Sequence, residues 1–144
     1  MQISGHLLSY SLLSAYNLAG CLMEDLTVFK AWTLTTDTAF NNRELRTMQH
    51  TTGVRVAEIY IVSKTAMTLY APFLVREESL LWWCVGAMAM SWTSSFLVQV
   101  PLQLEVKRSG DREALARLVK TTKVRTWSMV FHSAVVGWVL WSKL

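Results

Sequence analysis

The chain has 144 residues, a length that accommodates a single domain. Hydrophobic residues make up 52% of it and charged residues 17%, whereas a soluble domain carries roughly 25% charged residues. This composition excludes an intrinsically disordered chain, which would be polar and low in complexity. The chain has only two cysteines, so its composition also excludes a small disulfide-stabilised scaffold.

Stretches without charge divide the chain into four predicted membrane-spanning helices, because a helix needs about 20 mostly apolar residues to cross a bilayer. Three stretches contain no Asp, Glu, Lys or Arg: 1–23, 79–104 and 126–142. A fourth, 54–73, is interrupted only by Arg55, Glu58 and Lys64. The sequence therefore predicts an all-α integral membrane four-helix bundle, a single domain over residues 1–144. Its spans are expected near 4–30, 54–75, 79–103 and 124–143.

The first span lacks both a basic leading region and a small-residue cleavage site, so we expect it to be retained rather than cleaved as a signal peptide.

The connections between the spans carry most of the basic residues, and these set the predicted orientation. The first connection holds Lys30, Arg43 and Arg46, and the third holds seven Lys or Arg between 101 and 125. The second offers only Arg76, beside two glutamates. The positive-inside rule then places the first and third connections in the cytoplasm and both termini on the far side, as in a protein of the bacterial inner (plasma) membrane. Basic loops beside anionic lipid headgroups explain the net charge of +4, so we expect no nucleic-acid partner.

Both cytoplasmic connections contain amphipathic segments. Residues 37–50 place Phe40 and Leu45 among polar residues, and residues 111–123 begin with Asp111, a residue type that caps helices. We expect one or two interfacial helices that lie near the lipid headgroups.

Each predicted span has one polar stripe at helical spacing. Polar groups are costly in hydrocarbon unless they are satisfied, so these side chains should face the bundle interior. The stripes are Tyr10, Asn17 and Glu24; Thr51, Arg55 and Glu58; Ser91, Ser95, Gln99 and Gln103; and Arg125, Ser128 and His132. The charged members, the two glutamines and His132 fall in the cytoplasmic half of the membrane, which predicts a polar pocket between the helices that opens toward the cytoplasm.

These residue types suit the binding and deprotonation of a small acidic molecule. His132 and Glu58 are candidate general bases, and Arg55 and Arg125 are candidate stabilisers of an anion. The candidate ligand-binding residues are Asn17, Glu24, Ser95, Gln99 and Gln103. The alternative is that the charged residues pair only to make burial tolerable, or lie among the headgroups without a chemical role.

Glu24, Glu58, His50 and His132 are metal ligands by residue type, but they come from separate helices without diagnostic spacing, so we expect no metal or other cofactor. Lys64 lies deeper than these residues. It could extend toward the membrane surface, line the pocket or pair with a partner subunit.

Residues 92–140 contain a Thr/Ser-rich stretch after Trp92, the Val100-Pro101 step, Gly110-Asp111, Leu118-Val119 and Arg125-Thr126. With these features the region resembles the second half of a family of small four-span membrane proteins, mostly uncharacterised in bacteria, that are related to fungal anthrone oxygenases. The first half is similar in layout, through Phe40 and Glu58. The resemblance implies oxidation of a lipophilic polycyclic phenol by O₂ without an obvious metal or flavin. It would assign site roles to Arg125, Glu58 and Trp127.

Two functions are therefore expected from the sequence. In the first, the pocket binds a lipophilic aromatic or quinone-like molecule and oxidises it, as an anthrone-oxygenase-like enzyme without a cofactor would. In the second, the chain is a non-catalytic accessory subunit of a larger membrane protein complex. The expected partners are membrane lipids, the lipophilic small molecule and, in the second case, other membrane proteins.

Overall fold

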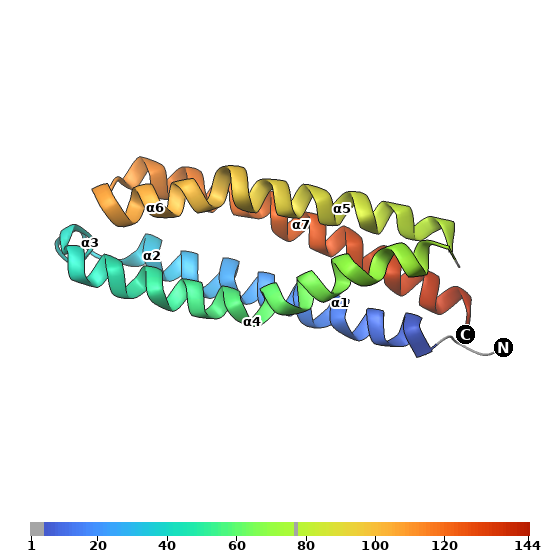
Figure 1. Cartoon of the computed structure of the whole chain (residues 1–144). Helices are drawn as coiled ribbons and strands as arrows, with labels where there is room; N and C mark the ends of the chain where they lie inside the picture. Colours follow the sequence, from blue (N-terminus) through green and yellow to red (C-terminus); the bar gives the residue numbers. More distant parts are fainter. Residues whose placement is uncertain (1–4, 77) are drawn as a thin grey trace.

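A computed structural model describes residues 5–76 and 78–144, and within these ranges the chain is helical without a strand (Figure 1). The elements in chain order are α1 (Gly5–Met23), the π-helical η1 (Glu24–Phe29), α2 (Lys30–Leu34), α3 (Asp37–Asn41), α4 (Arg43–Val75), the short 3₁₀ turn η2 (Ser79–Leu81), α5 (Trp82–Ser94), the π-helical η3 (Ser95–Gln99), α6 (Val100–Ser109) and α7 (Arg112–Ser142).

These elements form four long rods, and successive rods run in opposite directions (Figure 1). The first rod is α1, η1 and α2 in sequence, the second is α4, the third runs from η2 to α6 and the fourth is α7. The turns that hold α3 and join α6 to α7 lie at one end of the bundle, whereas both termini and the connection before α5 lie at the other (Figure 1). The prediction of an all-helical chain is thus confirmed, with four long helical segments near the predicted positions.

The helices extend further than the predicted spans at the end that carries α3. Helix α4 begins at Arg43 because the Asn42 side chain caps it, accepting hydrogen bonds from the backbone N–H groups of Glu44 and Leu45. Helix α7 begins at Arg112 because Asp111 caps it in the same way, through the N–H of Glu113 at 2.8 Å. Between α6 and α7 the chain turns at Gly110, whose φ of +69° favours glycine.

The segment 37–50 does not form one separate interfacial helix, because residues 37–41 are α3 and residues 43–50 are the first turns of α4. Residues 112–123 continue directly into the rest of α7. Phe40, expected at a membrane interface, is instead buried in a small apolar cluster with Trp32, Leu118 and others. Its position is fixed by Arg112, whose guanidinium lies over its ring and forms an ion pair with Asp37 at 2.9 Å.

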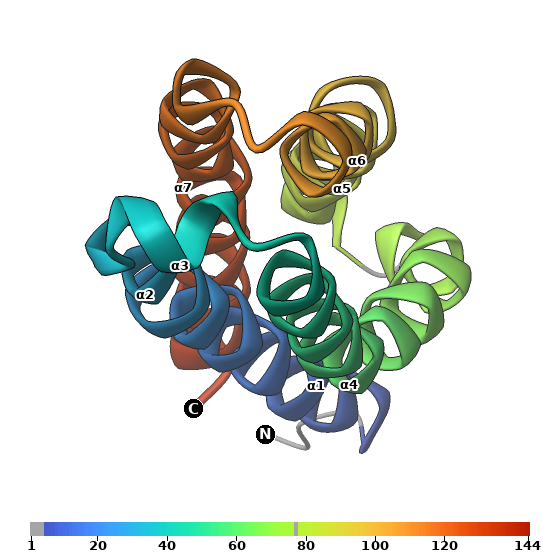
Figure 2. The ribbon, with the colours of Figure 1, turned by 90° about the vertical axis from the view of Figure 1, so that its left-hand side faces the viewer.

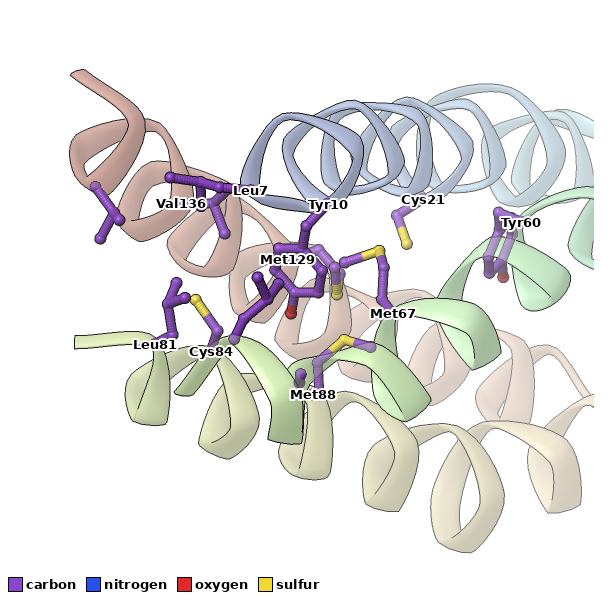
Figure 3. Close-up of a cluster of buried hydrophobic side chains, with 13 residues drawn as sticks. Leu7, Tyr10, Cys21, Tyr60, Met67, Leu81, Cys84, Met88, Met129 and Val136 are labelled. Carbon is purple, nitrogen blue, oxygen red and sulfur yellow. The ribbon is translucent and has the colours of Figure 1, made fainter. Parts of the chain in front are cut away.

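The main core lies toward the end that holds the termini. It is an apolar cluster in which side chains from α1, α4, α5 and α7 interdigitate, among them Tyr10, Met67, Met88 and Met129 (Figure 3). Helix α1 packs closely on α4 and α7, and α5 packs on α7, but α4 contacts α5 and α6 much less. The view along the bundle shows α4 lying beside α1 (Figure 2).

Among the described helical segments, only Ser79–Ser109 meets the length and apolarity of a membrane span, and 28% of its most apolar window is buried inside the protein. The other three long rods carry too much charge or polarity for the same criterion.

Candidate ligand-binding site

A cavity of about 210 Å³ lies between α4 and the rod formed by α5, η3 and α6. Helix α4 contributes one wall, including Tyr60 and Lys64, and the opposite wall includes Trp92 and Gln99. Glu24 from η1 and Arg125 from α7 also line it. The cavity therefore receives side chains from all four rods, and it lies where α4 is least tightly packed against its neighbours.

The inner wall is a buried cluster of three polar side chains. The Arg125 guanidinium forms an ion pair with the Glu24 carboxylate at 2.6 Å, and it donates a second hydrogen bond to the Tyr60 hydroxyl at 2.9 Å. The Tyr60 hydroxyl in turn donates to Glu24. Because each charge has an opposite charge and further hydrogen bonds, the cluster is tolerated in the interior and ties together η1, α4 and α7.

Two side chains at the cavity retain polar atoms without a hydrogen-bond partner in the described protein. These atoms are the Gln99 side-chain carbonyl Oε1 and the Arg125 Nε, and both residues are almost fully buried. The Gln99 amide nitrogen donates to the Ser94 hydroxyl at 3.2 Å. Buried polar atoms are nearly always paired in native proteins, so unpaired ones that border a cavity indicate a place for a polar ligand.

Both π-helical segments supply residues to this cavity. Glu24 is the first residue of η1, and Ser95, Phe96 and Gln99 belong to η3. Pro101 explains η3, because a proline ring clashes with the carbonyl four residues earlier and lacks the N–H that would bond to it. The wider turn accommodates that clash. Single π-helical turns occur frequently at functional sites.

The structure brings together six of the residues that the sequence nominated: Glu24, Glu58, Ser95, Gln99, Gln103 and Arg125 all line the cavity. Glu58, however, is exposed and has no ion pair or hydrogen bond among the described residues. The sequence stripe predicts that Glu58 points into the bundle and has a cationic or polar partner such as Arg55, Arg125 or His132. Glu58 does line the cavity, but no such partner lies within hydrogen-bonding reach among the described residues, so that part of the prediction is wrong.

Three other nominated residues lie elsewhere. Arg55 is exposed on the outer face of α4, and Trp127 projects outward with 68% of its surface exposed. Asn17 is buried on α1, where its amide donates to the Tyr60 carbonyl at 3.0 Å and to the Ser63 hydroxyl at 3.3 Å. None of these lines the cavity.

His132 is fully buried but belongs to a different polar cluster. Its Nε2 lies 2.9 Å from the Tyr10 hydroxyl and its Nδ1 lies 2.9 Å from the Ser14 hydroxyl. The ring therefore has both nitrogens engaged by neighbours within the core. It does not line the cavity, so it is not positioned as the base for a ligand bound there.

Sequence reasoning missed Tyr60 and left the role of Lys64 open. Both lie on the buried face of α4, which continues through Met67, Ala71 and Leu74 at spacings of three and four residues. The polar stripe chosen from the sequence, Thr51, Arg55 and Glu58, follows a neighbouring and mostly exposed face. The apolar periodicity of residues 60–74 was the signal that could have located the inward face.

Among the described residues, no group of three or more His, Cys, Asp or Glu side chains lies close enough to hold a metal ion. His50, one of the candidate ligands, lies outside the cavity; burial and the nearby Lys107 lower its pKa. No protein-family model, curated protein or solved structure matches the chain.

Proposed function

We propose that the chain is an integral membrane protein whose cavity between α4 and the α5–α6 rod binds the polar ring of a lipophilic molecule. The observation that carries the proposal is the cavity itself, which combines a buried charged wall and unpaired polar atoms with an apolar, aromatic side. Such a combination suits a ligand that has a polar head and an apolar body.

Exposure of apolar side chains supports the membrane assignment. The segment Ser79–Ser109 is apolar, yet 28% of its most apolar window is buried, whereas the core helix of a water-soluble protein is mostly buried. Trp82, Trp83, Trp138 and Trp141 are all strongly exposed on helix ends at one end of the bundle. Exposed tryptophans at the ends of apolar helices are typical of a membrane–water interface.

The opposite end of the bundle is polar and basic, and we place it in the cytoplasm. It holds the α3 turn and the α6–α7 turn, with Arg43, Arg46, Lys107 and Arg108 near them. Both termini then lie on the far side, as in an inner (plasma) membrane protein.

The size of the cavity limits what it encloses. A cavity of roughly 150 Å³ is known to hold benzene, so 210 Å³ suits a head of one or two rings. Sites that enclose whole drug-sized molecules are larger, at about 300–1,000 Å³. We therefore propose that the ring enters the cavity while the remainder of the ligand stays in the lipid.

A chemical role requires a base beside the bound ring, and Glu58 is the best placed. Glu24 also lines the cavity, but Arg125 and Tyr60 engage its carboxylate. Glu58 has no such partner and would take the proton of a phenolic hydroxyl. This role agrees with the oxidation of lipophilic phenols by O₂ that the resemblance to anthrone oxygenases implies.

Fluorescence quenching tests the binding function directly. Trp92 lines the cavity, so 2-methoxy-1,4-naphthoquinone, a neutral two-ring quinone, should quench its emission saturably when added to the protein in lipid nanodiscs. Trp92→Phe should remove the saturable component. Trp127→Phe is the control and should retain it, because Trp127 points away from the cavity.

The same preparation separates binding from the alternative accessory role. A ligand-binding protein should be monodisperse and bind the quinone when purified alone. The proposal would be contradicted if the wild type shows no saturable quenching. It would also be contradicted if the saturable quenching persists unchanged in Trp92→Phe. A chain that loses its fold without other membrane proteins would favour the accessory subunit.

A further inference from the structure

Lys64 is a buried cation for which the described protein provides no counter-ion. It lies in the middle of α4, is 1% exposed and lines the cavity. No carboxylate lies within ion-pair distance of its ammonium group, and its side chain has no hydrogen bond among the described residues. Its Nζ lies 4.2 Å from the centroid of the Trp92 ring.

The two carboxylates of the cavity do not neutralise this charge. Glu24 is committed to Arg125 and Tyr60, and Glu58 is exposed at the edge of the cavity without a partner among the described residues. The Trp92 ring offsets part of the cost of burying an ammonium group. A buried charge still favours a partner of opposite sign, and here the cavity is the open space beside it.

Two further residues that line the cavity carry polar atoms without a hydrogen-bond partner among the described residues. Arg125 Nε is a donor without an acceptor, and Gln99 Oε1 is an acceptor without a donor. Together with Lys64, the residues that line the cavity thus carry two donor groups and one acceptor without a partner among the described residues. A ring that carries an ionised hydroxyl and further oxygen groups would match these better than a hydrocarbon or a cation would.

The remaining side chains that line the cavity suit a ligand with a ring and an apolar body. Trp92 and Phe96 stack on each other, with 5.3 Å between ring centroids and 6° between planes, and both line the cavity. Val54, Ile61 and Val100 also line it and are partly exposed on the outside of the bundle. An apolar tail can therefore leave between α4 and α6 over apolar side chains.

We infer that the ligand of this cavity is an acidic ring amphiphile, a phenol or hydroxyquinone whose ionised hydroxyl pairs with the Lys64 ammonium while its apolar tail leaves between α4 and α6. This inference rests on the proposed function and specifies its ligand class. Lys64, rather than Arg55 or Arg125, is then the anion-binding residue, because Arg125 is already neutralised by Glu24.

A matched pair of probes tests the inference: 2-hydroxy-1,4-naphthoquinone, which is ionised at neutral pH, and its neutral 2-methoxy ether. Wild-type protein should bind the hydroxy compound about tenfold more tightly, the difference that one charge-assisted hydrogen bond makes. Lys64→Met should reduce the affinity for the hydroxy compound about tenfold and leave that for the ether within about twofold. Lys120→Met, at an exposed position on α7, is the control and should change neither.

The outcomes distinguish this inference from the proposed function. Binding of both probes with equal affinity, or an equal loss of both in Lys64→Met, would overturn the inference and leave the proposed function standing. Binding of the neutral ether alone would likewise overturn the inference only, whereas failure of both probes to bind the wild type would overturn the proposed function and the inference with it. If Lys64→Met does not fold, the preference of the wild type between the two probes decides the inference alone.

Discussion

Glu24 and Arg125 carry the main charged interaction inside the bundle. Their side chains are almost completely buried and lie 2.6 Å apart. Two charges removed from water are tolerable together, but either one alone is an uncompensated ion in the interior. The pair therefore maintains the cavity wall and depends on both of its members.

Glu24→Gln should lower the free energy of unfolding by about 3–5 kcal/mol, because it leaves the Arg125 guanidinium buried without its anion. Denaturant-induced unfolding in detergent measures the change. The matched control is Glu58→Gln, which should change the free energy by no more than about 0.5 kcal/mol, since Glu58 is exposed and unpaired. Equal effects of the two substitutions would show that the Glu24–Arg125 pair does not stabilise the bundle.

The sequence located some of these residues and not others, for a physical reason. Glu24, Gln99 and Arg125 stand out because they are polar within otherwise apolar stretches, and the structure brings them together at the cavity. Arg55 and Glu58 stand out equally, but they lie on an exposed face of α4. Helical spacing groups residues by face without saying which face is inward, and exposed apolar side chains on α4, such as Ile61, Val62 and Leu69, blur that distinction.

At the scale of the helices, α1 and α4 approach each other closely at Gly20. A Cβ atom at this position would lie 2.6 Å from the Cβ of Tyr60. Because Tyr60 also bonds to Glu24 and Arg125, this contact holds the inner wall of the cavity in place. Glycine is required here by the neighbouring helix rather than by backbone conformation.

Gly20→Ala should therefore destabilise the protein by about 1–3 kcal/mol, the usual cost of overpacking a close contact. Gly86→Ala is the control: no atom lies within 4 Å of its Cβ position, so the substitution should stabilise α5 by about 0.5–1 kcal/mol. Thermal unfolding in detergent compares the two variants. A Gly20→Ala protein as stable as Gly86→Ala would contradict the close packing of α1 on α4.

The sequence predicts that the four long helical segments exist. It predicts their ends and interruptions only in part. Asp111 was recognised as a cap, and it begins α7. The continuity of residues 43–50 with the rest of α4 was missed, because hydropathy marks where a helix becomes polar and not where its hydrogen bonding ends. The Asn42 cap, which does mark the start of α4, lies well before the apolar stretch.

For the whole molecule, the proposed orientation separates the two ends of the bundle by a membrane. Ser109 and Ser142 are both exposed and lie at opposite ends (Figure 1). In intact cells a membrane-impermeant maleimide should label Ser142→Cys, and it should label Ser109→Cys only after permeabilisation. The native Cys21 and Cys84 are buried and provide the low background. Labelling of both sites from the same side would contradict the orientation.

The proposed lipophile occupies the space between α4 and the α5–α6 rod. Ala57 lines the cavity, whereas Ala66 is exposed further along the same helix. Phenylalanine at position 57 would fill part of the 210 Å³, and phenylalanine at position 66 would not enter it. Both substitutions replace alanine with phenylalanine on α4, so they have the same effect on intrinsic helix propensity.

Mass spectrometry of small molecules retained by the purified protein shows whether a lipophile occupies the cavity. Wild type and Ala66→Phe, prepared from native membranes, should each retain about one ring-containing lipophile per chain, and Ala57→Phe should retain little while keeping its thermal unfolding midpoint. Equal retention by Ala57→Phe, or no retained lipophile in the wild type together with no binding of added quinone, would contradict the claim.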